Sequence, residues 1–166
     1  AVTLALTLAF EPPEQDVMKR APRDPAEPLL SGFLTWRIIF VSLILVTGTF
    51  GLFVWERENG ANIELARTVA VNTLVVFEIF YLLSARYLLA PALTYDGLTG
   101  NRYVWYAIGL LVLFQLAFTY LTPMQTLFGT ADIGLNAWVR IIAVGSTVLF
   151  LVEIEKAIIR RRCNRL

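Results

Sequence analysis

A single acidic residue, Glu78, stands in the middle of a long apolar stretch of the sequence, with no basic residue beside it. Within a membrane span, an ionisable side chain costs about 2.5–3.5 kcal/mol or more, so it normally faces the bundle interior and marks an ion or proton path. Burial without a cation would favour the protonated carboxyl, which suits proton exchange as well as cation binding. The alternative interpretation is a protonated Glu78 that only hydrogen-bonds to a neighbouring helix.

Two amide side chains, Asn72 and Gln115, also stand within apolar stretches. Amides at such positions commonly join helices through hydrogen bonds, so we expect helix–helix polar contacts there rather than chemistry. Gly48 and Gly51 are expected to allow close approach between helices, because a residue without a side chain leaves room for a neighbouring backbone. These four residues therefore predict contacts between neighbouring helices.

A group of charged residues follows the last apolar stretch. Glu153 and Glu155 precede Lys156 and the basic run 160–162. Long charged side chains near a helix end extend toward the membrane interface, and opposite charges pair there. We therefore interpret the acidic residues as snorkelling and ion-paired, and the basic run as a topological anchor that touches anionic lipid.

Several other kinds of site are excluded by the residue types. Histidine is absent and Cys163 is the single cysteine, which excludes an internal disulfide and argues against a zinc or haem site. The sequence has no glycine-rich phosphate loop and no nucleophile–base pair, and its basic residues form no nucleic-acid-binding stripe. It therefore predicts no catalytic residue, no firm metal ligand beyond Glu78, and no activity for this chain alone.

The elements that must position these residues follow from hydropathy. Hydrophobic residues make up 57% of the 166 residues and charged residues 16%, against about a quarter charged in soluble domains. Four apolar stretches are each near the roughly 20 residues that cross a membrane as a helix, and lipid cannot satisfy free backbone groups. We predict an all-α integral membrane fold, a four-helix bundle within 32–159. The expected spans are about 33–55, 68–90, 103–121 and 137–159.

Three segments lie outside this bundle. Residues 1–10 are apolar but too short to cross a membrane and lack an initial Met, so we interpret them as the end of a truncated transmembrane helix. Residues 11–31 are polar and hold five of the seven prolines, which predicts a stiff extended loop because proline fixes φ and lacks an amide donor. Residues 160–166 form a basic tail.

Positive charge is divided unequally between the two sides that four spans define. Arg57, Arg67 and Arg140 fall on one side. The basic residues on the opposite side are Lys19, Arg20, Arg23, Arg37, Arg86, Arg102, Lys156, Arg160, Arg161, Arg162 and Arg165. Because excess positive charge marks the cytoplasmic side, we predict a multi-pass cell-membrane protein whose proline-rich loop and C-terminus are cytoplasmic.

The proline-rich segment carries a specific motif. It reads Phe10-Glu-Pro-Pro-Glu-Gln-Asp-Val-Met-Lys-Arg-Ala-Pro-Arg-Asp-Pro-Ala-Glu-Pro-Leu-Leu-Ser31. The shared pattern is two prolines, an acidic residue, a hydrophobic–Met pair, and then Arg-x-Pro-Arg-x-Pro-x-Glu-Pro-Leu. This segment closely resembles the cytoplasmic loop between the sixth and seventh transmembrane helices of P2-type ATPases, the group of calcium and sodium/potassium pumps.

The resemblance extends over essentially the whole chain. Residues 66–68 are similar to the start of the eighth helix in bacterial members, residues 120–129 to the segment that leaves the ninth helix, and residues 151–156 to the end of the tenth. The resemblance implies that the four spans are helices seven to ten and that residues 1–10 end the sixth helix.

Roles for individual residues are also implied by this resemblance. Glu78 falls where calcium pumps of the reticulum type place the cation-site Glu of their eighth helix. Glu14, Asp16, Arg20 and Arg23 belong to the coupling loop, which in the family lies beside the phosphorylation domain and links it to the membrane.

One position departs from the calcium pumps. Their sixth helix carries an Asn-x-x-Thr-Asp motif, and counting back from Phe10 places the Asp of that motif at Ala1. In that register a main calcium carboxylate is missing, whereas a slip of one residue places the Asp before the chain. Calcium is therefore one candidate ion among the cations.

The sequence thus predicts the C-terminal transmembrane part of an ATP-driven P-type cation pump. Its expected partners are the lipid bilayer and the remaining transmembrane helices and cytoplasmic phosphorylation domain of the same pump, with no nucleic acid. ATP and magnesium are expected only in the intact pump, because this chain lacks the phosphorylation and nucleotide domains. The alternative is a free-standing four-helix membrane protein that acts as an assembly or regulatory subunit without enzymatic activity.

Overall fold

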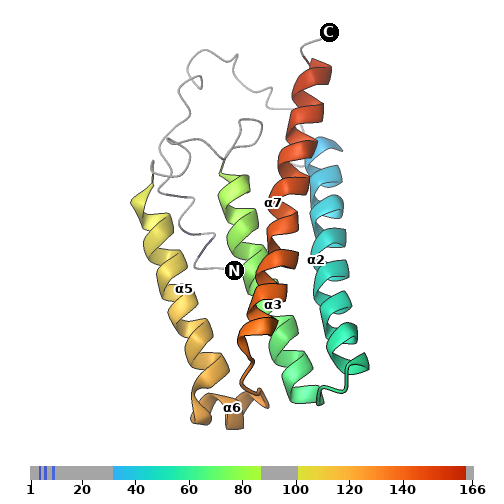
Figure 1. Cartoon of the computed structure of the whole chain (residues 1–166). Helices are drawn as coiled ribbons and strands as arrows, with labels where there is room; N and C mark the ends of the chain where they lie inside the picture. The colour runs from blue at the N-terminus through green and yellow to red at the C-terminus, as the bar shows by residue number, and fades with distance from the viewer. Residues whose placement is uncertain (1–3, 5, 7–8, 10–31, 87–100, 164–166) are drawn as a thin grey trace.

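The described part of the chain is built of helices joined by short turns, with no strand among the described residues (Figure 1). The computed structural model describes residues 4, 6, 9, 32–86 and 101–163, with side chains up to Arg161 in the last helix. In chain order the helices are α2 (Gly32–Glu58), α3 (Ile63–Ala85), α5 (Arg102–Tyr120), α6 (Thr122–Phe128) and α7 (Leu135–Cys163). The all-α prediction is therefore confirmed for the described residues.

Four of these helices are long and apolar enough to cross a membrane, namely α2, α3, α5 and α7 as far as Arg161. Their number and order agree with the prediction, and the largest difference in bounds is at α3. This helix begins at Ile63 because Asn62 caps it, accepting a hydrogen bond from the backbone N–H of Leu65 at 2.9 Å. Hydropathy missed this start because the first turns of α3 include Glu64 and Arg67. The helix ends at Ala85, and residues 87–90 of the expected span lie outside the described residues.

Helix α3 lies at the centre of a closely packed group with α2 and α7 (Figure 1). Gly48 of α2 is one reason, because a Cβ atom there would collide with the ring of Phe77 on α3. Gly145 of α7 plays the same part opposite Val76, a contact that the sequence did not reveal. The expectation of close approach is thus correct for Gly48, whereas a Cβ atom at Gly51 would meet nothing within 4 Å.

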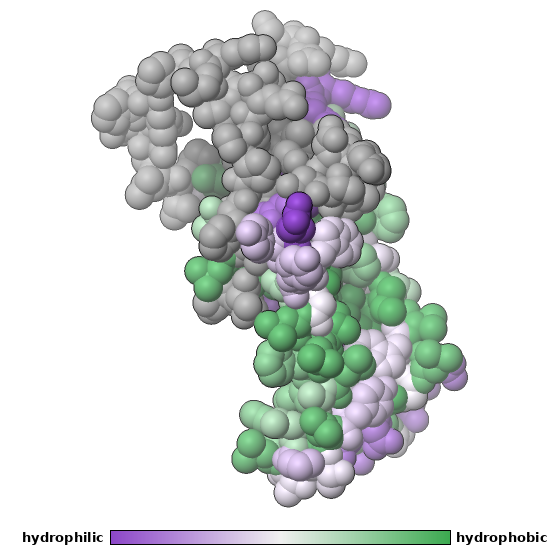
Figure 2. Space-filling model, turned by 90° about the vertical axis from the view of Figure 1, so that its left-hand side faces the viewer, coloured by the Kyte–Doolittle hydropathy of each residue, from purple (hydrophilic) through white to green (hydrophobic). Residues whose placement is uncertain are grey.

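Helix α5 stands beside this group and has a smaller contact with α3. An apolar gap of about 500 Å³ opens between α3, α5 and α7. Its lining residues are Val76, Ile79, Phe80, Ile108, Val112, Leu116, Trp138 and Ile142. The surface on this side is largely hydrophobic between more polar regions, as a lipid-facing surface must be (Figure 2).

The two ends of the bundle differ in charge and construction. At one end, here called the basic end, α2 and α5 begin and α3 and α7 finish (Figure 1). At the opposite end, here called the turn end, Gly60 with φ 85° turns the chain from α2 to α3, and α6 links α5 to α7. The helical residue Leu4 is buried near the basic end, where it packs with Leu82 and Val104.

Candidate functional site

Glu78 lies on α3 in a stripe of side chains that it forms with the exposed residues Val71 and Leu74. Val71 and Leu74 precede it by seven and four residues, a spacing that places all three on one side of a helix. They are 40% and 39% exposed, and Glu78 is half-buried. The opposite side of α3 is buried against α2 and α7, and its members include Val69 and Phe77. Glu78 therefore shares one side of α3 with two exposed residues and is itself half-buried.

A groove adjoins this stripe. It lies between α2 and α3, has a volume of about 570 Å³ and is almost wholly apolar. Its lining residues are Ser42, Leu45, Val46, Thr49, Phe50, Phe53, Ala70 and Leu74. Leu74 is shared between the groove and the Glu78 stripe, so the two adjoin each other on α3.

Glu78 does not belong to a complete metal site within the described residues. No three His, Cys, Asp or Glu side chains gather there closely enough to hold a metal ion. A hard cation such as Ca²⁺ takes six to eight oxygen ligands. Glu78 can supply one carboxylate to such a site, and two further acidic ligands would have to come from outside the described part of the chain.

Asn72 lies on the buried side of α3 and contacts α5. It is fully buried, and its amide nitrogen donates to the backbone carbonyl of Thr68 at 2.8 Å and to the Thr119 hydroxyl at 3.1 Å. The Thr119 hydroxyl in turn donates to the backbone carbonyl of Gln115 at 2.9 Å. The structure therefore brings Asn72 together with Thr119, a residue that the sequence did not single out because threonine is common within membrane helices.

Gln115 contributes to the contact at Thr119 through its backbone and not, as expected, through its side chain. Its backbone carbonyl accepts from Thr119, but its side-chain nitrogen is buried without a hydrogen-bond partner among the described residues. Its helix–helix role therefore stays a prediction.

The turn end is held by hydrogen bonds between segments far apart in the sequence. The Thr68 hydroxyl accepts from the backbone N–H of Ala131 at 2.9 Å, which joins α3 to the segment before α7. The Tyr120 hydroxyl donates to the carbonyl of Ile133 at 2.8 Å and accepts from the Trp138 indole at 2.7 Å. These contacts fix the connection from α5 through α6 to α7.

An ion pair joins α2 to α7 at the same end. Arg140 lies 2.6 Å from the carboxylate of Glu56, and its guanidinium stands 4.4 Å from the centre of the Trp55 ring. Both contacts compensate the cationic side chain for partial burial within the bundle.

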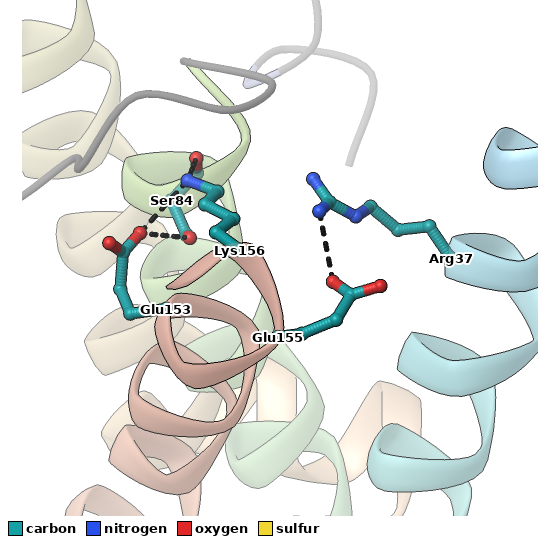
Figure 3. Close-up of polar contacts among 5 residues, drawn as sticks. All are labelled: Arg37, Ser84, Glu153, Glu155 and Lys156. Carbon is teal, nitrogen blue, oxygen red and sulfur yellow. Dashed lines mark hydrogen bonds and ion pairs between the residues drawn. The ribbon is translucent and has the colours of Figure 1, made fainter. Parts of the chain in front are cut away.

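A denser charged cluster occupies the basic end (Figure 3). Lys156 of α7 is fully buried, and its ammonium nitrogen lies 2.6 Å from the Ser84 carbonyl of α3 and 2.9 Å from the Glu153 carboxylate. The next acidic residue, Glu155, pairs with Arg37 of α2 at 2.9 Å, a charge contact whose atoms are not aligned for a hydrogen bond. Ion pairing is therefore correct for Glu153 and Glu155. Lys156, for which there was no separate prediction from the sequence, points into the bundle, where α3 offers it a carbonyl.

Other predicted residues fall outside the described part of the chain. These are Ala1 and the coupling-loop residues Glu14, Asp16, Arg20 and Arg23. The last helix continues to Cys163, so the basic run 160–162 is helical and only residues 164–166 of the expected tail are undescribed.

Comparison with known proteins gives this arrangement a family. The family model described as "Cation transporting ATPase, C-terminus" matches residues 1–158. The chain belongs to the cation-transporting ATPase family. This confirms the resemblance first indicated by the proline-rich segment, and with the four apolar helices it makes the chain part of a multi-pass membrane protein.

Similar cation-transporting ATPases come from bacteria and animals. The chain is 43% identical over 164 residues to "Probable cation-transporting ATPase F" of Mycobacterium tuberculosis, covering 99% of this chain and 18% of that protein. It is 35% identical over 145 residues to "Cation-transporting ATPase pma1" of Synechocystis, covering 83% of this chain and 16% of that protein. It is 31% identical over 160 residues to human "Calcium-transporting ATPase type 2C member 1", covering 95% of this chain and 17% of that protein. The chain thus spans less than a fifth of the length of these relatives.

Proposed function

We propose that this chain is the C-terminal transmembrane part of an ATP-driven P-type cation pump. Domains elsewhere in the intact protein would bind ATP and magnesium and carry the phosphorylated residue. The chain would support the transport helices and contribute Glu78 to the path of the cation or of a counter-transported proton. Phosphorylation would shift the membrane part between inward-open and outward-open states.

The observation that carries this proposal is the position of Glu78, a half-buried carboxylate within the α3 span that shares a side of the helix with the exposed residues Val71 and Leu74. An ionisable group within a membrane span normally faces protein or a water-filled path, so we expect this side of α3 to face further helices of the intact molecule. The adjoining groove of about 570 Å³ offers space for such a neighbour. A carboxylate between this chain and other helices is positioned to complete a site whose remaining ligands they supply.

The orientation is part of the proposal. The basic end would face the cytoplasm, because excess Lys and Arg mark that side. The segment 11–31 would then meet the phosphorylation domain and couple it to the membrane part. The free-standing subunit is disfavoured because similarity of 43% over 164 residues links the chain to a much longer ATPase.

The transported ion is proposed as a cation that prefers oxygen ligands. The human relative is named for calcium, and the mycobacterial and cyanobacterial relatives only for cations. Calcium is therefore the first ion to test.

Replacement of Glu78 in the complete pump tests the proposal. We expect Glu78→Gln to lower cation-dependent ATP hydrolysis and uptake about tenfold or more, since a contact to a charged group contributes roughly 1.5–3 kcal/mol. Activity should be measured with calcium, manganese, sodium and potassium. Glu64→Gln makes the same change in the first turn of α3 and should leave activity close to that of the unmodified pump.

Two outcomes separate the proposed roles. A loss of cation dependence identifies Glu78 as a ligand, whereas a loss of pH dependence alone identifies it as part of a proton path. Activity equal to that of the unmodified pump at every ion and pH would refute the transport role.

A further inference from the structure

Lys156 makes an unusual contact for a lysine near the end of a membrane span. Its side chain is fully buried between α7 and the end of α3 (Figure 3). Its nitrogen lies 2.6 Å from the carbonyl oxygen of Ser84 and 2.9 Å from the carboxylate of Glu153. The Ser84 hydroxyl also donates to the Glu153 carboxylate at 2.8 Å. The ammonium and carboxylate of α7 thus both bind one residue of α3.

Ser84 belongs to the last turn of α3, which ends at Ala85. Carbonyls in the last turn of a helix lack an intrahelical donor, and the helix dipole makes this end favourable for a cation. An ammonium has three N–H donors and is costly to bury without partners. The contact therefore satisfies both groups, and Lys156 caps the C-terminus of α3 from a neighbouring helix.

The same turn of α7 also holds α2. Glu155 directly precedes Lys156 and lies 2.9 Å from Arg37, and both side chains of this pair are buried. Helix α7 also packs along α3 between its two ends. One turn of α7 therefore anchors the basic ends of two helices and can set the position of α3 along the membrane normal.

We propose that Lys156 is a positioning residue for Glu78, a role that rests on the proposed function of Glu78. Glu78 lies six residues before Ser84, about 9 Å along the helix axis. Cation ligands must lie within narrow distances, about 2.3–2.6 Å for calcium. By capping α3, Lys156 sets the height at which Glu78 presents its carboxylate.

The test compares two cations of α7 in the complete pump. Lys156→Met keeps most of the length of the side chain but removes the charge and the donors. Arg161→Met removes a charge five residues later, from an exposed side chain, and is the matched control. Lys156→Gln is the second variant, because it keeps an N–H donor for the Ser84 carbonyl and the Glu153 carboxylate and so keeps the proposal testable if the Met variant fails to fold.

The first readout does not depend on transport. Hydrogen exchange of the backbone amides in the last turn of α3 should become faster in Lys156→Met, less so in Lys156→Gln, and remain unchanged in Arg161→Met. Unchanged exchange in both Lys156 variants would overturn the cap itself, whatever Glu78 does.

The second readout is the cation concentration that half-saturates ATP hydrolysis. We expect it to rise about 2-fold to 30-fold in the Lys156 variants, the range for mutations that act on a site from a distance, with the KM for ATP unchanged. Combining Lys156→Met with Glu78→Gln should add nothing further, because both act on one group. Faster exchange with unchanged cation dependence would overturn the positioning role. If Glu78→Gln leaves the activity of the pump unchanged, the proposed function of Glu78 is refuted, whereas the hydrogen-exchange result for the cap still holds.

Discussion

At the residue scale, polar side chains within the spans divide by the side of α3 on which they lie. Asn72 is fully buried and makes its hydrogen bonds within this chain. Glu78 lies on the open stripe with Val71 and Leu74. A buried polar group is costly without partners, so Asn72 stabilises the fold through its hydrogen bonds, whereas the proposed role of Glu78 concerns transport.

The contact between Asn72 and Thr119 leads to a prediction about stability. We expect the variants Asn72→Leu and Thr119→Val each to lower the free energy of unfolding, with a coupling energy of about 0.6 kcal/mol and not above about 1.7 kcal/mol, as for hydrogen bonds between membrane helices. The measurement is a double-mutant cycle from unfolding in mixed micelles. Thr126→Val is the control, because its hydroxyl is exposed and bonds to the carbonyl of Thr122 within α6. Additive effects would contradict a direct contact.

At the element scale, α3 is the helix on which the others assemble. Small residues on its neighbours allow this, since Gly48 of α2 faces Phe77 and Gly145 of α7 faces Val76. Lipid provides no hydrophobic driving force between helices, so close packing of this kind carries much of their association. Glycines facing α3 and glycines facing outward therefore have different consequences for stability.

Gly48 and Gly51 are a matched pair one turn apart on α2. We expect Gly48→Ala to destabilise the helix bundle by about 1–3 kcal/mol, because the added methyl group overlaps the fully buried Phe77 ring. Gly51→Ala has open space around it and should be neutral or stabilise by up to about 1 kcal/mol through helix propensity. Unfolding of the two variants of this chain in detergent measures the difference. Equal losses would show that the α2–α3 contact differs from the one described.

At the scale of the whole molecule, the two ends are built for different surroundings. Six basic residues among those with described side chains gather at the basic end, namely Arg37, Arg86, Arg102, Lys156, Arg160 and Arg161. The turn end has the tight turn at Gly60 and the short helix α6. Excess positive charge at one end predicts a single orientation in the membrane.

Labelling of cysteine residues in intact cells tests this orientation. In a complete pump with its other cysteines replaced, a membrane-impermeant maleimide should modify a cysteine at Glu58, on the turn end. It should modify the native Cys163 only after the membrane is permeabilised, since the basic end is expected inside. A Cys163→Ser variant controls for background. The reverse pattern would invert the proposed topology.

The sequence by itself determined the class of fold, the four spans and the family. Hydropathy decided the spans because the cost of exposing backbone groups to lipid leaves only helices. The proline-rich motif indicated the family, which the match over residues 1–158 confirms. Glu78 was also recognisable from the sequence, because a lone carboxylate in an apolar stretch is rare.

Only the tertiary structure decided which polar residues meet and which way they point. Asn72 and Thr119 are 47 residues apart in the chain, and hydropathy carries no information about such pairs. The position of Lys156 could not be predicted either, because the cost of burying its charge depends on the carbonyl of Ser84, 72 residues away. A span is a property of one segment and its solvent, whereas a polar contact depends on how two segments pack.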